Sequence, residues 1–408
     1  MNYQNEYEWL LKLEKAVPTK GYGTRLSMYL LSLEAWRRGL KVKFFIEDNP
    51  DNKMLIRYSL SDGLNEYNFE SSRGEKLSDF AYEVCENKAK TKDILSKAGI
   101  SVPEGKRFRI NQANEILDYA RSLNYPVVLK PLSANTGTGV FANITNPSEL
   151  KFSLNYVRDT FGFDEILIEK RVEGTEYRVL VLTNKVIAAV KRIPANITGN
   201  GQNTIRELIE LKNSLKNNNP NLYNRSIHID QEVLNKLNKL GYNLDTVLED
   251  GKQIFLRDKV ALDGDPIDVT DDLSNEIQSF AIKAVKSVPG LDLCGLDIVV
   301  DEERQMFTVL ELNTRPMLGL HVYPVKGKAR DVMSPIIDYY FPETANKNNH
   351  SMLYFDFNAV IAPLKDRSVK EVVLSPPPMV EQFYAKEYVL SGCHTVGDYK
   401  KIVRIEAL

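Results

Sequence analysis

Two short apolar runs near residue 300 constrain this chain more than any other stretch. Residues 296–300 and 307–312 are apolar, and the polar residues 301–305 separate them. Strand-length apolar runs joined by a short polar segment predict a β-hairpin. Oxygen-bearing side chains interrupt this pattern at Asp297 in the first strand and at Glu311 and Asn313 in the second. Because strand side chains alternate between faces, Glu311 and Asn313 should share one face.

These three side chains suit a hard divalent cation. Mg²⁺ prefers carboxylate and amide oxygens and usually completes its shell with water and phosphate oxygens. The hairpin therefore predicts a metal site beside a nucleotide. Acidic residues are also common on solvated strand faces, so the hairpin alone leaves an ordinary amphipathic rim open as the alternative. Phosphate-binding and adenine-binding segments upstream must decide between the two interpretations.

Length and charge limit the class of protein. A chain of 408 residues can hold two or three domains with substantial cores. Lys and Arg (53) nearly balance Asp and Glu (55), so no overall field favours nucleic acid or an anionic membrane as a partner. No apolar run approaches a membrane span and the first residues do not resemble a signal peptide, so we expect a cytoplasmic protein. The three cysteines are widely spaced, which argues against a disulfide framework or a zinc site.

The first 130 residues read as alternating helices and strands. We expect a helix over 26–38 after Gly21 and Gly23, then strands at 41–46 and 54–60. The two glycines and Arg25 could hold an anion at the helix N-terminus, but a plain loop is the simpler interpretation. Further helices are expected over 86–100 and 111–123, followed by a strand over 126–130.

A glycine-rich segment follows the strand that ends at Lys130. Glycine and hydroxyl residues after a strand form a flexible loop whose backbone N–H groups can face phosphate oxygens. The lysine precedes the glycines, so the segment is not a Walker A loop. A solvated β-hairpin turn remains the alternative for this stretch by itself. The candidate residues of the loop are Ser133, Thr136, Gly137, Thr138 and Gly139.

The next segment suggests a nucleoside site. A buried strand over 165–169 ends in acidic residues, and the exposed backbone beside Glu169 and Val172 could meet an adenine edge. Glu176 could accept hydrogen bonds from ribose hydroxyls. Arg178 and Arg192 begin and end an antiparallel strand pair, and two arginines there suit a polyphosphate or an acyl phosphate.

The region between this pair and the hairpin is less informative. Residues 199–265 are polar and partly helical, and the Asn-rich tract 212–224 predicts a surface loop or a mobile lid edge. A short strand over 253–256 ends at Arg257. A helix should run from Thr270, which with Asp271 is a candidate cap, to about residue 287.

With these segments in order, the chain resembles the ATP-grasp superfamily, and most closely the domain found in cyanophycin synthetases and bifunctional glutathione synthetases. The resemblance covers about residues 86–335. Each motif is weak alone, and their order and spacing together are specific. The motifs lie at residues 87–92, 128–131, 133–140, 168–178, 191–201, 256–258, 295–297 and 311–313.

The resemblance implies an α/β (α+β) architecture, the ATP-grasp fold, in which two α/β subdomains grip ATP. Residues 1–85 would form a small N-terminal pre-ATP-grasp domain. Residues 86–345 would form the ATP-grasp domain, with 86–170 as the lid subdomain and 171–345 as the metal and substrate subdomain. Residues 346–408 read as a separate short α/β appendage. Its tail faintly resembles the start of an acylphosphatase, with Lys400 in place of that family's arginine, and we assign it no activity.

The resemblance also implies roles for individual residues. ATP phosphates would be held by Lys88, Lys130 and the glycine-rich loop, adenine by Glu169, Lys170 and Val172, and ribose by Glu176. Two Mg²⁺ ions, which Mn²⁺ could replace, would be bound by Asp297, Glu311 and Asn313. Charge on the γ-phosphate and the intermediate would be stabilised by Arg178, Lys191, Arg192 and Arg257.

One position departs from several ATP-grasp ligases, which carry an arginine two residues before the metal-binding aspartate. This chain has Gly295 there, as the cyanophycin synthetase type does, so we expect another arginine to supply that charge. Beyond the hairpin, Arg315 could clamp a substrate carboxylate. His321 could orient a substrate or take a proton, or could be a structural histidine.

The function implied is that of an ATP-dependent carboxylate–amine ligase, which activates a carboxylate as an acyl phosphate and joins it to an amine. We expect amino acids or peptides as small-molecule partners, neither nucleic acid nor membrane, and leave homodimer formation open. One alternative is a nucleotide-binding module without catalysis that serves regulation or assembly. Another is a biotin-carboxylase-like or purine-pathway enzyme of the same superfamily.

Overall fold

The computed structural model describes residues 17, 19–48, 54–132, 138–345, 353–376, 388–390 and 401–405. Ser133, Thr136 and Gly137 of the glycine-rich loop lie outside the described residues, as does most of the acylphosphatase-like tail. Within the described ranges, every helix is too short or too polar to cross a membrane.

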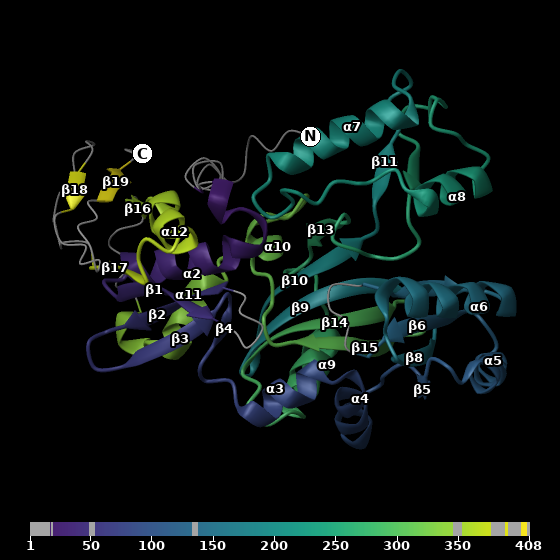
Figure 1. Ribbon diagram of the computed structural model, residues 1–408, viewed down its shortest axis with the longest axis horizontal. Helices are drawn as coiled ribbons and strands as arrows, with labels where there is room; N and C mark the ends of the chain where they lie inside the picture. Colours follow the sequence, from purple (N-terminus) through teal and green to yellow (C-terminus); the bar gives the residue numbers. More distant parts are fainter. Residues whose placement is uncertain are drawn as a thin grey trace.

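A five-stranded antiparallel sheet lies at the centre of the described structure (Figure 1). Its strands, in spatial order, are β13 (Asp265–Asp268), β10 (Lys185–Ile193), β9 (Thr175–Leu182), β14 (Leu293–Asp301) and β15 (Met306–Asn313). One face packs on α9 (Asn275–Lys286), where Val179, Leu296 and Ile298 join a core with Ala281 and Ala284. Since side chains alternate along a strand, the polar residues of β9, β14 and β15 face the other way.

The predicted hairpin is confirmed as β14 and β15, and it contains a bulge that the sequence did not predict. Asp297 pairs with Glu311, whereas the next residue, Ile298, pairs with Val309. Leu310 is therefore an extra residue in β15, as in a β-bulge. In a regular ladder Asp297 would stand opposite Leu310. The bulge is what sets the two carboxylates directly opposite each other.

Helix α9 begins later than expected. It starts at Asn275, and its N-cap is Ser274, whose side chain accepts a hydrogen bond from the backbone N–H of Ile277. Thr270 is not the cap, because its hydroxyl donates to Asp268 Oδ1 at 2.6 Å.

The lid is a four-stranded sheet in the order β5-β8-β6-β7, on the right of Figure 1. Its elements are β5 (Gly105–Arg109), α5 (Ala113–Ser122), β6 (Val127–Pro131), β7 (Phe141–Ile144), α6 (Pro147–Tyr156), η3 (Val157–Phe161) and β8 (Glu165–Lys170). Strands β6 and β8 and helix α5 lie close to where the sequence predicted them, whereas β5 and β7 were not predicted. The expected helix over 86–100 is α4 (Lys88–Lys97), preceded by α3 (Asp79–Glu86). Leu95 of α4 packs into the core of the central sheet rather than into the core of the lid.

A small helical unit rises from the central sheet. It contains β11 (Asn196–Thr198), α7 (Ile205–Asn217), α8 (Gln231–Lys239) and β12 (Gln253–Phe255) around its own apolar core. The prediction of a surface loop over 212–224 is wrong. Its first half continues α7, and Asn221 and Leu222 in its second half are only 2% and 3% exposed.

The N-terminal body is a second five-stranded sheet, in the order β17-β1-β2-β3-β4, on the left of Figure 1. Its strands are β1 (Lys41–Asp48), β2 (Met54–Ser61), β3 (Glu66–Glu70), β4 (Arg73–Gly74) and β17 (Glu371–Leu374). Three helices share its core: α2 (Leu26–Arg37), α11 (Met333–Tyr340) and α12 (Phe357–Lys365). Two short 3₁₀ turns, η1 (Thr19–Gly21) and η2 (Gly23–Arg25), precede α2, and η4 (Pro342–Thr344) follows α11.

The C-terminal residues do not form a separate unit up to residue 374. Strand β17 pairs antiparallel with β1, and α12 packs on the N-terminal body, so this stretch completes the first sheet instead of standing apart. The remaining described strands form a three-stranded sheet in the order β16 (Leu353–Phe355), β19 (Lys401–Ile405) and β18 (Tyr388–Leu390).

Candidate active site

Charged side chains cluster on the polar face of the central sheet. Asp297 is the cross-strand neighbour of both Glu311 on β15 and Arg178 on β9, so all three project from one face. Arg178 donates to both Asp297 oxygens, from Nε to Oδ1 and from Nη2 to Oδ2 at 2.8 Å. Arg192 on β10 forms an ion pair with Glu176 and lies 3.4 Å from Asp297 Oδ2. The sequence placed these five residues in one site, and the structure brings them together.

Burial and neighbouring charges shift the pKa values of the carboxyl groups in this cluster. Burial alone would raise the pKa of Asp297, but Arg178 and Arg192 hold the pKa of that carboxyl below its usual value. Burial raises the pKa of Glu176 to about 7, an increase that Arg192 opposes and Asp297 reinforces. At neutral pH Asp297 is therefore an anion, while Glu176 can bind a proton.

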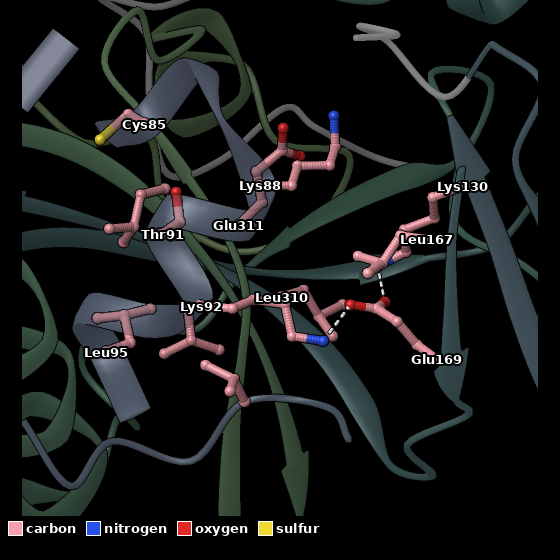
Figure 2. A pocket seen from close by; sticks show the side chains of 13 residues that line it. Cys85, Lys88, Thr91, Lys92, Leu95, Lys130, Leu167, Glu169, Leu310 and Glu311 are labelled. Carbon is pink, nitrogen blue, oxygen red and sulfur yellow. Dashed lines mark hydrogen bonds and ion pairs between the residues drawn. The ribbon is translucent and has the colours of Figure 1, made fainter. Parts of the chain in front are cut away.

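Two lysines converge on one buried glutamate in a neighbouring pocket (Figure 2). Glu169, at the end of β8, is 3% exposed. Its Oε1 lies 2.7 Å from Lys92 Nζ and its Oε2 lies 2.7 Å from Lys130 Nζ. Burial opposes ionisation, and the two lysines nevertheless hold the pKa of Glu169 below its usual value. Lys92 belongs to a motif noted in the sequence but was not chosen there as a site residue.

The pocket is open to solvent, comprises about 370 Å³ of space including that opening, and lies between the lid and the central sheet. Residues of α3 and α4, of the lid and of the hairpin all contribute to its lining. Its lining is Cys85, Lys88, Thr91, Lys92, Leu95, Val102, Lys130, Leu167, Glu169, Val309, Leu310, Glu311 and Leu312. The bulged Leu310 and the carboxylate-bearing Glu311 thus face the same space as Lys88 and Lys130.

The hairpin offers oxygen donors for a cation. Asn313 Nδ2 donates to the Gly295 carbonyl at 3.1 Å, which leaves its amide oxygen as the atom for a metal. Across the described ranges, no cluster of three or more His, Cys, Asp or Glu side chains has a metal-binding arrangement. The protein would therefore supply the carboxylates of Asp297 and Glu311 and one amide oxygen. This set fits Mg²⁺, which commonly takes its remaining ligands from water and phosphate.

The space above Gly295 is occupied by Arg178. A Cβ atom at Gly295 would lie 2.8 Å from Pro316 Cβ, 3.2 Å from Arg178 Cδ and 3.5 Å from Arg178 Nη1. A side chain at position 295 would press first on Pro316 and then on Arg178. Arg178 therefore packs closely against the position where other ligases carry the arginine.

A family model described as the ATP-grasp domain matches residues 85–318, which is more than half of the chain. The chain belongs to the ATP-grasp family.

Similar proteins include a cyanophycin synthetase and two bifunctional proteins of glutathione biosynthesis. The cyanophycin synthetase of Geminocystis herdmanii is 33% identical over 69% of this chain and 33% of its own length. The glutathione biosynthesis bifunctional protein of Clostridium perfringens is 33% identical over 78% of this chain and 41% of its own length. The solved bifunctional glutathione synthetase from Pasteurella multocida has 26% identity and a TM-score of 0.51, over 70% of this chain and 40% of that one. The chain thus spans between a third and about two fifths of these ATP-grasp proteins.

Two expected ATP-grasp site residues, Lys191 and Lys170, point away from the cluster. Lys191 projects from the opposite face of β10, where its Nζ lies 3.2 Å from Glu302 and 5.3 Å from the centre of the Tyr177 ring. Lys170 Nζ donates to the carbonyls of Leu123 and Asn124, at the end of α5. Adjacent strand residues face opposite sides, so neither lysine can share the face of the Glu169 or Arg192 beside it.

Arg257 is enclosed by three carboxylates of the helical unit. Its guanidinium lies 2.7 Å from Asp230, 2.6 Å from Glu232 and 2.8 Å from Asp263. These contacts fix the segment that follows β12, and Lys259 in that segment donates to the Val140 carbonyl at 3.0 Å. Arg257 therefore positions a segment that reaches the end of the glycine-rich loop.

At the described end of the glycine-rich loop, Gly139 adopts a left-handed backbone conformation. Gly139 has a φ of +69°, a backbone region unfavourable for other residues, and Thr138 beside it is exposed. Val172, expected beside the adenine, is half-buried in the turn that leaves β8.

The two expected substrate residues differ in exposure. Arg315 is half-exposed and forms an ion pair with Glu70 of the N-terminal body, which also binds Arg57 and Arg73. His321, in α10 (Gly319–Val322), is 0% exposed, and neither ring nitrogen has a hydrogen-bond partner among the described residues. Complete burial favours the structural interpretation of His321 over direct contact with a substrate.

We predict that His321→Leu removes a pH dependence of stability. The difference in the free energy of unfolding, His321→Leu minus the unmodified chain, should be about 2 kcal/mol more positive at pH 5 than at pH 8. Burial, followed by the charge of Arg178, lowers the pKa of His321 to about 3, from 6.5 when unfolded. The unfolded chain therefore binds a proton that the folded chain rejects, and stability falls as pH drops from about 6.5 towards 3. Urea unfolding at the two pH values measures this, with the exposed His228→Leu as control. Equal effects at both pH values would contradict it.

We predict that Glu169→Gln costs about 2 kcal/mol of stability at pH 7, because it leaves two neighbouring lysines without their shared carboxylate. The pKa of Glu169 is depressed, so its contribution is present above the unfolded value of 4.5 and is lost as the pH falls through the folded value. The difference between the two proteins should accordingly shrink as urea unfolding is repeated from about pH 5 towards pH 3. Glu165→Gln, an exposed position at the start of the same strand, is the control. A pH-independent difference would rule out the ionic origin.

Proposed function

We propose that this chain catalyses ATP-dependent ligation of a carboxylate to an amine. The observation that carries the proposal is that Lys88, Lys130 and Glu311 of the hairpin all line one pocket (Figure 2). Cations for phosphates and a carboxylate for a divalent metal are what Mg-ATP requires at one place. Membership of the ATP-grasp family, and similarity to cyanophycin and glutathione synthetases, support the same reaction class.

We assign ATP to the pocket between the lid and the central sheet. Lys88 and Lys130 bind its phosphates, and the glycine-rich loop, including Thr138 and Gly139, covers them. Glu169 pairs with Lys92 and Lys130 and keeps both in place until the nucleotide binds. The backbone around Val172 meets the adenine. Lys170 takes part through its main chain, since its side chain points to α5. Glu176, with a pKa near neutrality, accepts from the ribose.

Asp297, Glu311 and Asn313 would hold Mg²⁺, which when bound neutralises charge on the phosphate oxygens. Arg178 and Arg192 lie beside these ligands and stabilise negative charge on the transferring phosphoryl group. Arg178 in particular supplies the charge that an arginine at position 295 would otherwise provide. Lys191 and Arg257 act indirectly, if at all, because both are held by other partners.

The chemistry requires no protein nucleophile. A carboxylate oxygen of the substrate attacks the γ-phosphorus of ATP, and the bond to the β-phosphate oxygen breaks to release ADP. The amine then attacks the carbonyl of the acyl phosphate, and phosphate leaves as the amide forms. Preorganised positive charge on the polar face of the sheet lowers the barrier to the first step.

A screen of phosphate release tests this proposal. Mg-ATP is offered with pooled amino acids and with pooled dipeptides, and the product of any active pool is identified by mass spectrometry. We expect at least one pool to stimulate release of one phosphate per amide bond formed. ATP binding without stimulated release in any pool would instead favour the nucleotide-binding module without catalysis.

A further inference from the structure

The loop between α7 and α8 contacts two other parts of the molecule. The Gly23 amide, just before α2, donates to the Pro220 carbonyl at 2.9 Å, and the rings of Tyr22 and Tyr223 meet edge to face at 5.4 Å. Asn219 Nδ2 donates to the Tyr323 carbonyl at 3.2 Å, just past α10. The loop is thus fixed against both the N-terminal body and the segment that follows the hairpin.

Arg225 in this loop lacks the carboxylate partner that the other site arginines have. Its Nη1 donates to Asn221 Oδ1 at 3.4 Å and its Nη2 to Met317 Sδ at 3.1 Å. A thioether is a weak acceptor. Among the described residues no acidic side chain lies within 4.0 Å of it, whereas Arg178 and Arg192 each have one.

A buried donor beside Arg225 is unsatisfied. Asn221 is 2% exposed, and its Nδ2 has no hydrogen-bond partner in the described part of the chain. Its Oδ1 accepts from Arg225, so the amide N–H₂ and the guanidinium are neighbours. Gly319 makes room for this amide, since a Cβ atom there would lie 3.0 Å from Asn221 Oδ1. A buried donor without an acceptor costs about 1–3 kcal/mol, and this one lies beside a guanidinium that has no carboxylate partner, so the pair suits an anion.

Arg225 and Asn221 border the candidate active site without belonging to its cluster. Burial, and then the positive charge of Arg192, lowers the pKa of Arg225 to about 10, so the two guanidinium groups are close enough to repel. Met317, which Arg225 contacts, lies four residues after Asn313 in the sequence. No hydrogen bond or ion pair joins Arg225 to Asp297 or Glu176. Arg192, by contrast, contacts the metal-ligand candidate Asp297 directly.

We propose that Arg225 and Asn221 bind a carboxylate of the amino-acid or peptide substrate other than the carboxylate that is phosphorylated. The inference rests on the proposed ligase function and adds the substrate feature that this side of the site recognises. A guanidinium and a neighbouring amide N–H₂ match the two oxygens of a carboxylate. The phosphates of ATP have their own cations in Lys88 and Lys130, which line the pocket that we assign to the nucleotide.

Ligand-observed NMR in the presence of Mg²⁺ and a non-hydrolysable ATP analogue tests the site without requiring turnover. The probes are the amino acids and dipeptides of the pools, the same compounds with every carboxylate converted to an amide, and inorganic phosphate. Arg225→Gln should weaken binding of the acids about 30-fold and remove their advantage over the amides. Arg225→Lys should restore part of the affinity. Asn221→Asp should abolish binding, because its own carboxylate can pair with Arg225.

Arg206→Gln, at an exposed position on α7, is the matched control and should bind like the unmodified protein. The proposal is overturned if Arg225→Gln binds the acids as the unmodified protein does, or if the unmodified protein binds acids and amides equally. It is also overturned if the only affinity that Arg225→Gln loses is for inorganic phosphate. Far-ultraviolet circular dichroism and urea unfolding check that each variant is folded.

Kinetics separate this inference from the proposed function. With an active substrate pair, Arg225→Gln should raise the KM of one substrate about 30-fold while kcat and the KM of ATP change less than about 3-fold. A loss in kcat at unchanged KM would assign Arg225 to the reacting group and refute the inference. If no pool supports turnover, the ligase proposal fails, and the NMR comparison still decides whether Arg225 binds a carboxylate.

Discussion

Glu311→Gln is expected to reduce ligase turnover by at least about 10³-fold while changing the free energy of unfolding by no more than about 0.5 kcal/mol. Glu311 faces the pocket that we assign to Mg-ATP, so the change removes charge from a metal ligand. Metal-assisted charge stabilisation contributes several kcal/mol to such a reaction, and about 4 kcal/mol corresponds to a 10³-fold loss. Phosphate release at saturating ATP and urea unfolding provide the two measurements.

Asp297→Asn should lose as much turnover but should also cost about 3 kcal/mol of stability. Asp297 is 5% exposed and accepts two hydrogen bonds from Arg178, so the amide leaves a buried guanidinium without its counter-charge. The two variants together separate the metal role, which they share, from the structural role, which only Asp297 has. Glu303→Gln, in the exposed hairpin turn, is the control. Near-normal turnover in either site variant would remove the metal assignment.

The sequence predicted the location of the site because strand alternation is a local rule. Glu311 and Asn313 are two residues apart, and this alone determines that they share a face. The position of Asp297 opposite Glu311 depended on the bulge at Leu310, for which no local pattern was evident. Bulges arise from how two strands pair, so the sequence of one strand does not reveal them.

Roles carried by neighbouring charged residues could not be separated from sequence. Lys191 and Arg192 were both expected at the phosphates, although adjacent strand residues must face opposite sides. Only the pairing of β10 with β9 shows that Arg192 faces Asp297 while Lys191 faces Glu302. In the same way, Glu169 faces Lys130 while the side chain of Lys170 points to the end of α5.

Contacts between distant segments were the hardest to predict. Strand β17 joins β1 across more than 300 residues, and the loop that holds Arg225 packs against Gly23 and Tyr323. Such pairings depend on which apolar surfaces meet after the elements form. The Asn-rich composition around Arg225 is typical of an exposed loop, and burial of Asn221 by α10 and α2 overrides it.

Arg178→Met is expected to lower turnover by about 10²–10³-fold, the effect of removing one fixed donor from a transition state. It should also destabilise the fold by about 3 kcal/mol, because Asp297 then keeps only the 3.4 Å contact with Arg192. Arg178→Lys retains the charge without the paired hydrogen bonds, so its turnover should lie between the two. Arg38→Met, which breaks a comparably buried ion pair in the N-terminal body, should lose stability and keep kcat.

Gly295→Ala then tests whether Arg178 stands in for an arginine at position 295. The new Cβ would press on Arg178 Cδ, so Gly295→Ala should lower turnover about 10-fold when Arg178 is present. With Arg178→Met already made, the same change should have little further effect on kcat, since the displaced guanidinium is gone. Additive losses in kcat would show that Gly295 acts through Pro316 instead, and that the charge must come from elsewhere. A non-additive result would identify close packing between Arg178 and Gly295 as the reason that this ATP-grasp chain can have glycine at 295.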